Sequence, residues 1–150
     1  MKLIASLITW SMLTGTAYAG AWGDGSFEND DALDWVADCV KSVTPVPVSA
    51  AIDGAVRSKY IEAPEGSAAV AAAEVVAAAL GKPSSKLPSE LRAWVRRQST
   101  EQLAQLAPAA RTALARILDS KVSELRQLWS EGKLNTWSQN IVELQSRLTK

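Results

Sequence analysis

The chain has 150 residues, of which 16 are Lys or Arg, 16 are Asp or Glu and none is His. This length is typical of one domain whose core needs no disulfide or metal, and the neutral charge gives no indication of a surface for nucleic acid or for anionic membranes. Without histidine, the sequence excludes Ser-His-Asp and Cys-His nucleophile pairs and nearly all zinc sites built on imidazole.

Residues 1–19 have the pattern of a secretory signal peptide. Lys2 supplies one positive charge, an apolar stretch covers 3–13, and the tripeptide AYA ending at Ala19 is the small-x-small pattern that signal peptidase recognises. The apolar stretch is about half the length of roughly 20 residues that a spanning helix needs. We therefore predict cleavage between Ala19 and Gly20, a periplasmic or secreted location and no stable membrane anchor.

The first helices of the remaining chain follow a glycine-containing opening segment. Asn29 and the two acids after it supply an N-cap side chain and negative charge for a helix that ends near Ser42. Pro45 and Pro47 then predict a break, and we expect a short second helix over 49–59.

The third predicted helix, over 64–80, is apolar on nearly every side, and Glu74 is the only charge in its stretch SAAVAAAEVVAAAL. A helix without a polar face is typically central and covered by its neighbours. A carboxylate there is costly unless it is paired, so Glu74 is expected to meet an ammonium, a guanidinium or the indole N–H of Trp22 or Trp35. The alternative is a raised-pKa acid in a cleft.

The last third of the chain predicts four more helices, over about 91–98, 110–118, 122–129 and 136–148, and the middle two can alternatively form one continuous helix. Ser99 with Gln102 fits a capping box for a turn between the first two, and Thr136 with Gln139 fits a capping box at the start of the last. We therefore predict an all-α fold for residues 20–150: a single domain with a compact array of six or seven helices.

Cys39 is the only cysteine, so no disulfide can form within the chain. We interpret Cys39 as a small apolar packing residue on the buried side of the first helix, with a reactive thiol or an intermolecular disulfide as the alternative. The tryptophans in apolar registers are interpreted in the same way. Trp22, on the irregular opening segment, is the expected exception.

From residue 20 onward the chain resembles the family catalogued as domain of unknown function 4259. Three blocks carry the resemblance: GAWGDGSFENDDALDW, then YIEAPEGSAAVAAAEVVAAALGKP followed by LPSELRAWV, and finally ALARILDSKVSELRQLWSEG. Together they cover essentially all of residues 20–150. The family has no established activity, so the resemblance implies a helical fold and transfers no catalytic residue.

The predicted cleavage site and the first of these blocks meet at Gly20. We hypothesise that the free ammonium of Gly20 is held by the domain. Acidic partners are available before Lys41: Asp24, Glu28, Asp30, Asp31, Asp34 and Asp38. Helix caps and a solvated face explain this acidic stretch better than a cation site, because its spacing differs from that of a calcium loop, and we predict neither metal nor cofactor.

A basic stretch of similar length follows later in the chain and consists of Lys82, Lys86, Arg92, Arg96 and Arg97. It can dock against the acidic stretch within the molecule or bind an anionic partner, and both alternatives stay open.

The leading functional hypothesis is a non-enzymatic binding protein of the cell envelope whose partner is another protein, in one version a toxin that it neutralises. It rests on export, compactness and the missing catalytic chemistry. The candidate binding residues are Trp22, Asp31, Glu74, Arg92 and Arg96. The alternative is a hydrolase of an envelope polymer that uses two acids such as Asp31 and Glu74, which requires carboxyl groups about 5 to 10 Å apart across an open cleft.

Overall fold

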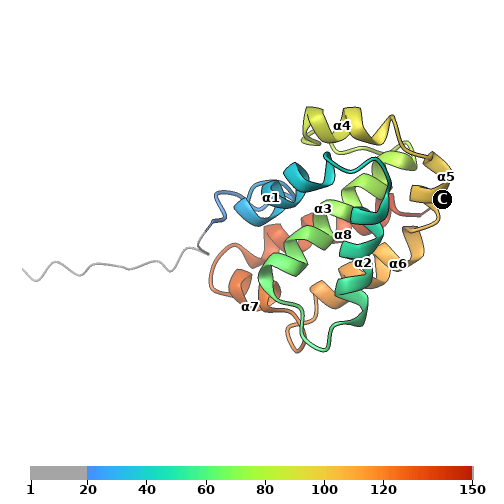
Figure 1. Cartoon of the computed structure of the whole chain (residues 1–150). Helices are drawn as coiled ribbons and strands as arrows, with labels where there is room; N and C mark the ends of the chain where they lie inside the picture. Colours follow the sequence, from blue (N-terminus) through green and yellow to red (C-terminus); the bar gives the residue numbers. More distant parts are fainter. Residues whose placement is uncertain (1–19, 150) are drawn as a thin grey trace, which may run out of the picture.

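A computed structural model describes residues 20–149 of the chain, so the predicted signal peptide lies outside the described residues. These residues form one compact helical domain without a strand, and the all-α prediction is confirmed for them. Eight helices are present in this part of the chain (Figure 1): α1 Asp30–Cys39, α2 Val46–Arg57, α3 Ala63–Ala79, α4 Ser89–Val95, α5 Thr100–Ala104, α6 Ala107–Ile117, α7 Glu124–Ser130 and α8 Leu134–Arg147. None of these helices is long and apolar enough to cross a membrane.

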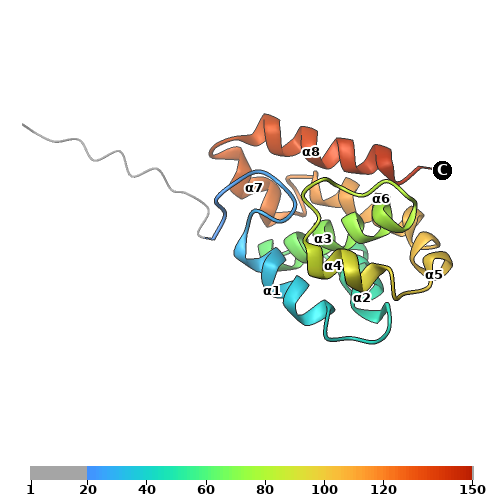
Figure 2. The ribbon, with the colours of Figure 1, turned by 90° about the horizontal axis from the view of Figure 1, so that it is seen from above.

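Helix α3 is the central element, as its apolar sequence predicts. Twelve of its 17 residues are buried, and it packs against each of the seven other helices. In Figure 2, α8 lies on one side of α3 while α1 and α2 lie on the other. Small side chains make these close approaches possible: a Cβ on Gly66 would lie 3.3 Å from Leu125 Cδ2 of α7.

The first two helices differ from the sequence prediction only at their ends. The Asn29 side chain accepts a hydrogen bond from Ala32 N at 2.8 Å, which confirms the predicted N-cap of α1, although this helix ends before Ser42. The predicted break between the first two helices is present, with Pro45 as the N-cap of α2, but α2 begins at Val46 rather than near Ser49 and includes Pro47 in its first turn. Proline is tolerated there since the first N–H groups of a helix have no partner within it.

The prediction of six or seven helices is too low because the segment after Ser99 forms a helix of its own, α5. Its predicted cap is present: Ser99 Oγ accepts from Gln102 N at 3.3 Å. Helices α6 and α7 are separate, and Ser123 caps α7 after a turn at residues 118–123.

The capping box predicted at Thr136 is wrong. Helix α8 begins earlier, at Leu134, and no side chain caps it.

The aromatic and sulfur side chains follow the sequence interpretation. Trp94 is fully buried and Trp137 nearly so, whereas Trp22 is 60% exposed. Cys39 is 1% exposed, and burial raises the pKa of its thiol to about 12. A protonated, buried thiol supports the packing role of Cys39 over the reactive alternative.

Candidate functional site

The opening segment, residues 20–29, folds into a tight loop closed by backbone hydrogen bonds. Trp22 N donates to Glu28 O at 3.0 Å, and Asp30 N donates to Gly20 O at 2.8 Å. Gly20 has a φ of +101°, a left-handed conformation that favours glycine. From this loop Ser26 bonds α3, Asp24 bonds α8 and Glu28 bonds the connection between α3 and α4.

The Glu28 carboxylate is enclosed by the loop that carries it. Its Oε2 accepts from Gly25 N at 2.8 Å and its Oε1 accepts from Lys86 Nζ at 3.0 Å. A Cβ on Gly25 would lie 2.7 Å from Glu28 Oε2, and one on Gly23 would lie 3.0 Å from Glu28 Cβ, so both positions need glycine for this enclosure. The hydrogen bond from Lys86, then the Gly25 N–H, lower the pKa of Glu28 against a smaller opposing effect of burial.

Glu74 is the buried acid at the centre of the candidate site, with 3% exposure. Arg147 Nη1 donates to Glu74 Oε2 and Arg147 Nη2 to Glu74 Oε1, both at 2.9 Å, and Ser26 Oγ donates to Glu74 Oε1 at 2.8 Å. The prediction that Glu74 meets a guanidinium is confirmed. Among the described residues its hydrogen-bond donors are Arg147 and Ser26, and neither Trp22 nor Trp35 donates its indole N–H to it.

Arg147 is also held from its other side. Its Nε donates to Glu143 Oε1 at 2.8 Å, and its Nη1 also donates to Lys82 O at 3.1 Å. Burial alone would lower the pKa of Arg147, but the hydrogen bonds and charges of Glu74 and then of Glu143 raise it above the ordinary value. The guanidinium is therefore a fixed positive charge between two carboxylates.

An open hollow of about 190 Å³ lies over this cluster, and its lining includes Ser26, Glu74, Lys86, Glu143 and Arg147. Each of these charged side chains is paired within the molecule. Both oxygens of Glu74 already accept hydrogen bonds from Arg147, so the arrangement is suited to holding the fold together.

A second, much smaller hollow adjoins the first and contains an unsatisfied hydroxyl. Ser67 Oγ is buried and has no hydrogen-bond partner among the described residues. The hollow measures about 10 Å³ and is lined by Trp129 and Trp137, whose stacked rings have centroids 5.9 Å apart. This volume is about enough for one water molecule, so we interpret the hollow as a water site.

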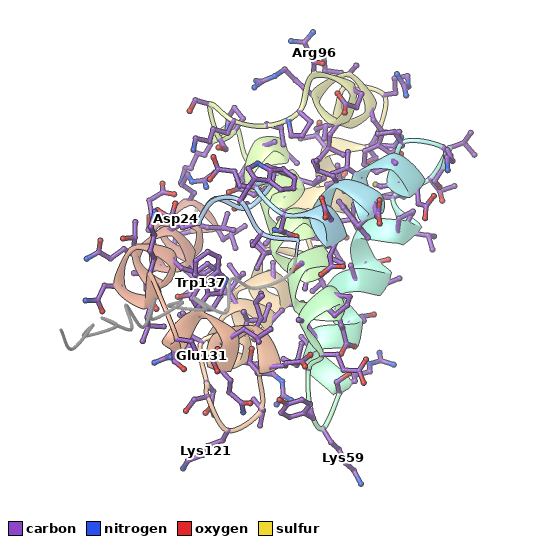
Figure 3. The ribbon with its side chains drawn as sticks, turned by 90° about the vertical axis from the view of Figure 1, so that its left-hand side faces the viewer. Asp24, Lys59, Arg96, Lys121, Glu131 and Trp137 are labelled. Carbon is purple, nitrogen blue, oxygen red and sulfur yellow. The ribbon has the colours of Figure 1, made fainter. Side chains whose placement is uncertain are left out.

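The five candidate residues do not meet in one site. Trp22 is exposed on the opening loop, Asp31 lies in the first turn of α1 next to the positive end of the helix dipole, and Glu74 is buried in α3. Arg92 and Arg96 come together along a groove beside α4. In Figure 3, Arg96 projects at one end of the molecule, far from Asp24 and Trp137.

The acidic stretch is distributed rather than clustered. Among residues 20–149, no three His, Cys, Asp or Glu side chains lie close enough together to hold a metal ion. Asp30 lies against Gly20, since a Cβ on Gly20 would be 3.2 Å from Asp30 Oδ2. That the free ammonium of Gly20 is held by the domain stays a prediction.

Docking of the basic stretch on the acidic one is confirmed only for Lys86, which pairs with Glu28 at 3.0 Å. Lys82 Nζ instead donates to Thr149 O at 2.6 Å. Arg96 and Arg97 form no ion pair with any residue that the structure describes.

A family model described as Domain of unknown function (DUF4259) matches residues 20–140. The chain belongs to this family. No curated protein and no solved structure matches the chain. The DUF4259 match begins at the residue that follows the predicted cleavage site, and it includes the opening loop, Glu74 and the first half of α8, whereas Arg147 lies beyond its end.

Two residues of α8 that hold this part of the DUF4259 domain together were not predicted from the sequence: Arg147, which pairs with Glu74, and Asn140, which bonds the opening loop. Asn140 Nδ2 donates to Asp24 O at 3.0 Å. A signal was present: Arg147 and Asn140 both lie three residues from members of the buried stripe, so they share its face of the helix. The stripe consists of Trp137, Ile141, Leu144 and Leu148.

Proposed function

We propose that this DUF4259 protein is an exported, non-enzymatic binding protein that acts on another protein of the cell envelope. In one version of the proposal the partner is a toxin that the protein neutralises. Two observations support export: the signal-peptide pattern over residues 1–19, and a family match that begins at residue 20.

The observation that carries the binding proposal is the contrast between the interior charges and the charges of α4. In the cluster around Glu74 every charge has a partner within the molecule, since Glu74 and Glu143 both pair with Arg147. Arg96, at the surface, has no acidic partner in the described part of the chain. Arginine is enriched among the residues that contribute most of the binding energy in protein interfaces, and its guanidinium matches a carboxylate through two hydrogen bonds.

The geometry gives little support to the alternative, a hydrolase that uses Asp31 and Glu74. Both oxygens of Glu74 accept hydrogen bonds from Arg147, and one also accepts from Ser26. Asp31 is not part of the lining of the hollow beside Glu74. An acid–base pair across a cleft requires two carboxyl groups that face the same space.

The test is capture of the partner by the processed protein. Residues 20–150, immobilised through the C-terminus, are exposed to the envelope and secreted fractions of the protein's own organism, and the retained proteins are quantified by mass spectrometry. We expect one partner retained in stoichiometric amount. No stoichiometric partner would contradict the proposal, and release of soluble fragments from envelope polymer that is lost on Glu74→Gln would support the hydrolase instead.

A further inference from the structure

Helix α4 is held firmly at one end of the molecule, where it lies away from α7 and α8 (Figure 1). Its inner face is fixed by Leu91 and Trp94, which are both fully buried. Trp94 Nε1 donates to Ser42 O at 2.7 Å and so ties α4 to the connection between α1 and α2. The remaining faces of α4 are therefore presented on a rigid support.

A groove of about 300 Å³ lies between α4, the end of α3 and the connection between them. Apart from Gly81, its lining consists of four apolar residues and two arginines, with no acidic side chain: Ala78, Pro83, Leu87, Val95, Arg92 and Arg96. Pro83 restricts the backbone of one wall, so the groove is present before any partner arrives.

Arg92 lies in α4 and Arg96 is its C-cap, whose N–H donates to Arg92 O at 3.3 Å, so the two arginines stand one helical turn apart on the same side of the helix. Arg92 is half-buried, and its Nη2 lies 3.4 Å from Ser84 O, which holds the guanidinium at the groove. Neither arginine forms an ion pair within residues 20–149. Both charges lie at the C-terminal end of α4, where the helix dipole favours cations, and neither is neutralised by a carboxylate of the described domain.

We propose that this groove binds an acidic segment of the partner protein, with an apolar side chain of that segment in the groove and its carboxylates on Arg92 and Arg96. The inference rests on the proposed function and names its site. A guanidinium matches a carboxylate through two parallel hydrogen bonds, and arginine beside an apolar pocket is a frequent centre of binding energy in protein interfaces.

A larger groove of about 580 Å³ elsewhere on the surface lacks this charge pattern. It lies beside α5 and α6, and its charged lining residues are Glu101 and Arg111, one of each sign. This groove therefore favours no charge in an occupant. Arg111 is exposed, which makes Arg111→Gln a matched control that removes the same charge at the other groove.

The first experiment selects ligands for the processed protein from a random dodecapeptide library displayed on phage. We expect selected sequences that combine an apolar residue with two or more Asp or Glu. Synthetic peptides with these sequences should bind at least tenfold more weakly to the Arg92→Gln, Arg96→Gln double variant and unchanged to Arg111→Gln. Selection without acidic residues, no enrichment at all, or equal affinity for the double variant would overturn the proposal.

A second variant distinguishes a loss of binding from a folding defect of the Arg92→Gln, Arg96→Gln variant. Arg96 is exposed, so Arg96→Glu is expected to leave the circular dichroism spectrum unchanged while it abolishes binding of the acidic peptides. A vesicle of phosphatidylglycerol is the competing anionic probe, and tighter binding to it than to the peptides would overturn the assignment to a protein segment.

The capture experiment separates the groove from the function. If the wild-type protein and the Arg92→Gln, Arg96→Gln variant retain a partner equally, the groove is not the binding site, while the proposed binding function is supported. If neither a partner nor an acidic peptide is retained, both proposals fail.

Discussion

The guanidinium of Arg147 and the carboxylate of Glu74, 73 positions apart in the chain, are joined by two hydrogen bonds of 2.9 Å. Because Ser26 donates to the same carboxylate, this pair connects the central helix to both α8 and the opening loop. Three parts of the sequence that are remote from one another therefore meet at one buried charge. The stability of the domain should depend on this charge far more than on its surface ion pairs.

Replacing Glu74 by leucine is expected to lower the free energy of unfolding by about 3 kcal/mol, because it leaves a largely buried guanidinium without its main partner. The Arg147 side chain is only 17% exposed. Urea denaturation of residues 20–150 measures the loss. The matched control is Glu143→Leu, which removes the exposed partner of Arg147 and should cost less than about 1 kcal/mol.

The same reasoning predicts partial recovery when the second charge is removed. The double variant Glu74→Leu, Arg147→Met should be more stable than Glu74→Leu alone, since the cost comes from the unpaired charge. If Glu74→Leu by itself is neutral, the buried pair does not have the structural role described above.

The stability that Glu28 contributes to the opening loop should depend on pH. Its pKa is lower in the folded state than the ordinary value of 4.5, first through the hydrogen bond from Lys86. The contribution of ionised Glu28 to the free energy of unfolding is therefore complete above about pH 4.5. It is lost as the pH falls through the pKa that Glu28 has in the folded state. An NMR titration of Glu28 Cδ should show this lowered pKa, and Lys86→Gln should move it back toward 4.5. An unchanged pKa in Lys86→Gln would contradict the pairing.

The glycines of the opening loop should be intolerant of a methyl group. In Gly23→Ala the new Cβ would overlap Glu28 Oε2 and lie 3.0 Å from Glu28 Cβ, so the Glu28 side chain must leave its partners. We expect a loss of about 1 kcal/mol, or about 4 °C in Tm. Gly132→Ala is the control, because no atom lies within 4 Å of its Cβ position. Equal melting temperatures for the two variants would contradict the enclosure of Glu28.

Cys39 should be unreactive in the folded protein. With a pKa raised to about 12 and 1% exposure, its thiol has neither the charge nor the access that alkylation needs. Labelling by a maleimide at pH 7 should require hours in buffer and seconds in concentrated urea. Rapid labelling of the native protein would revive the interpretation of Cys39 as a reactive thiol.

The pairing of Glu74 could be predicted from sequence, whereas its partner could not. A single carboxylate in an apolar helix must be neutralised wherever the helix packs, so the requirement is local. Arg147 is one of 16 basic residues, and only the packing of α8 on α3 decides which of them reaches Glu74.

The positions of helix centres could also be predicted, because they depend on a local pattern in the sequence. The positions of helix ends could not. Apolar periodicity located all the longer helices, but Pro47 is compatible both with a break and with a first helical turn. The polar match at Thr136 gave no cap, because α8 starts one half-turn earlier at Leu134. Such choices of one or two residues depend on tertiary packing rather than on the local pattern.

The central claim is that an exported helical domain acts by binding another protein, and native mass spectrometry of the protein isolated from its own cells tests it most directly. The account predicts a complex that contains one partner and a chain whose mass begins at Gly20. A free chain that begins at Met1 would contradict both the processing and the function.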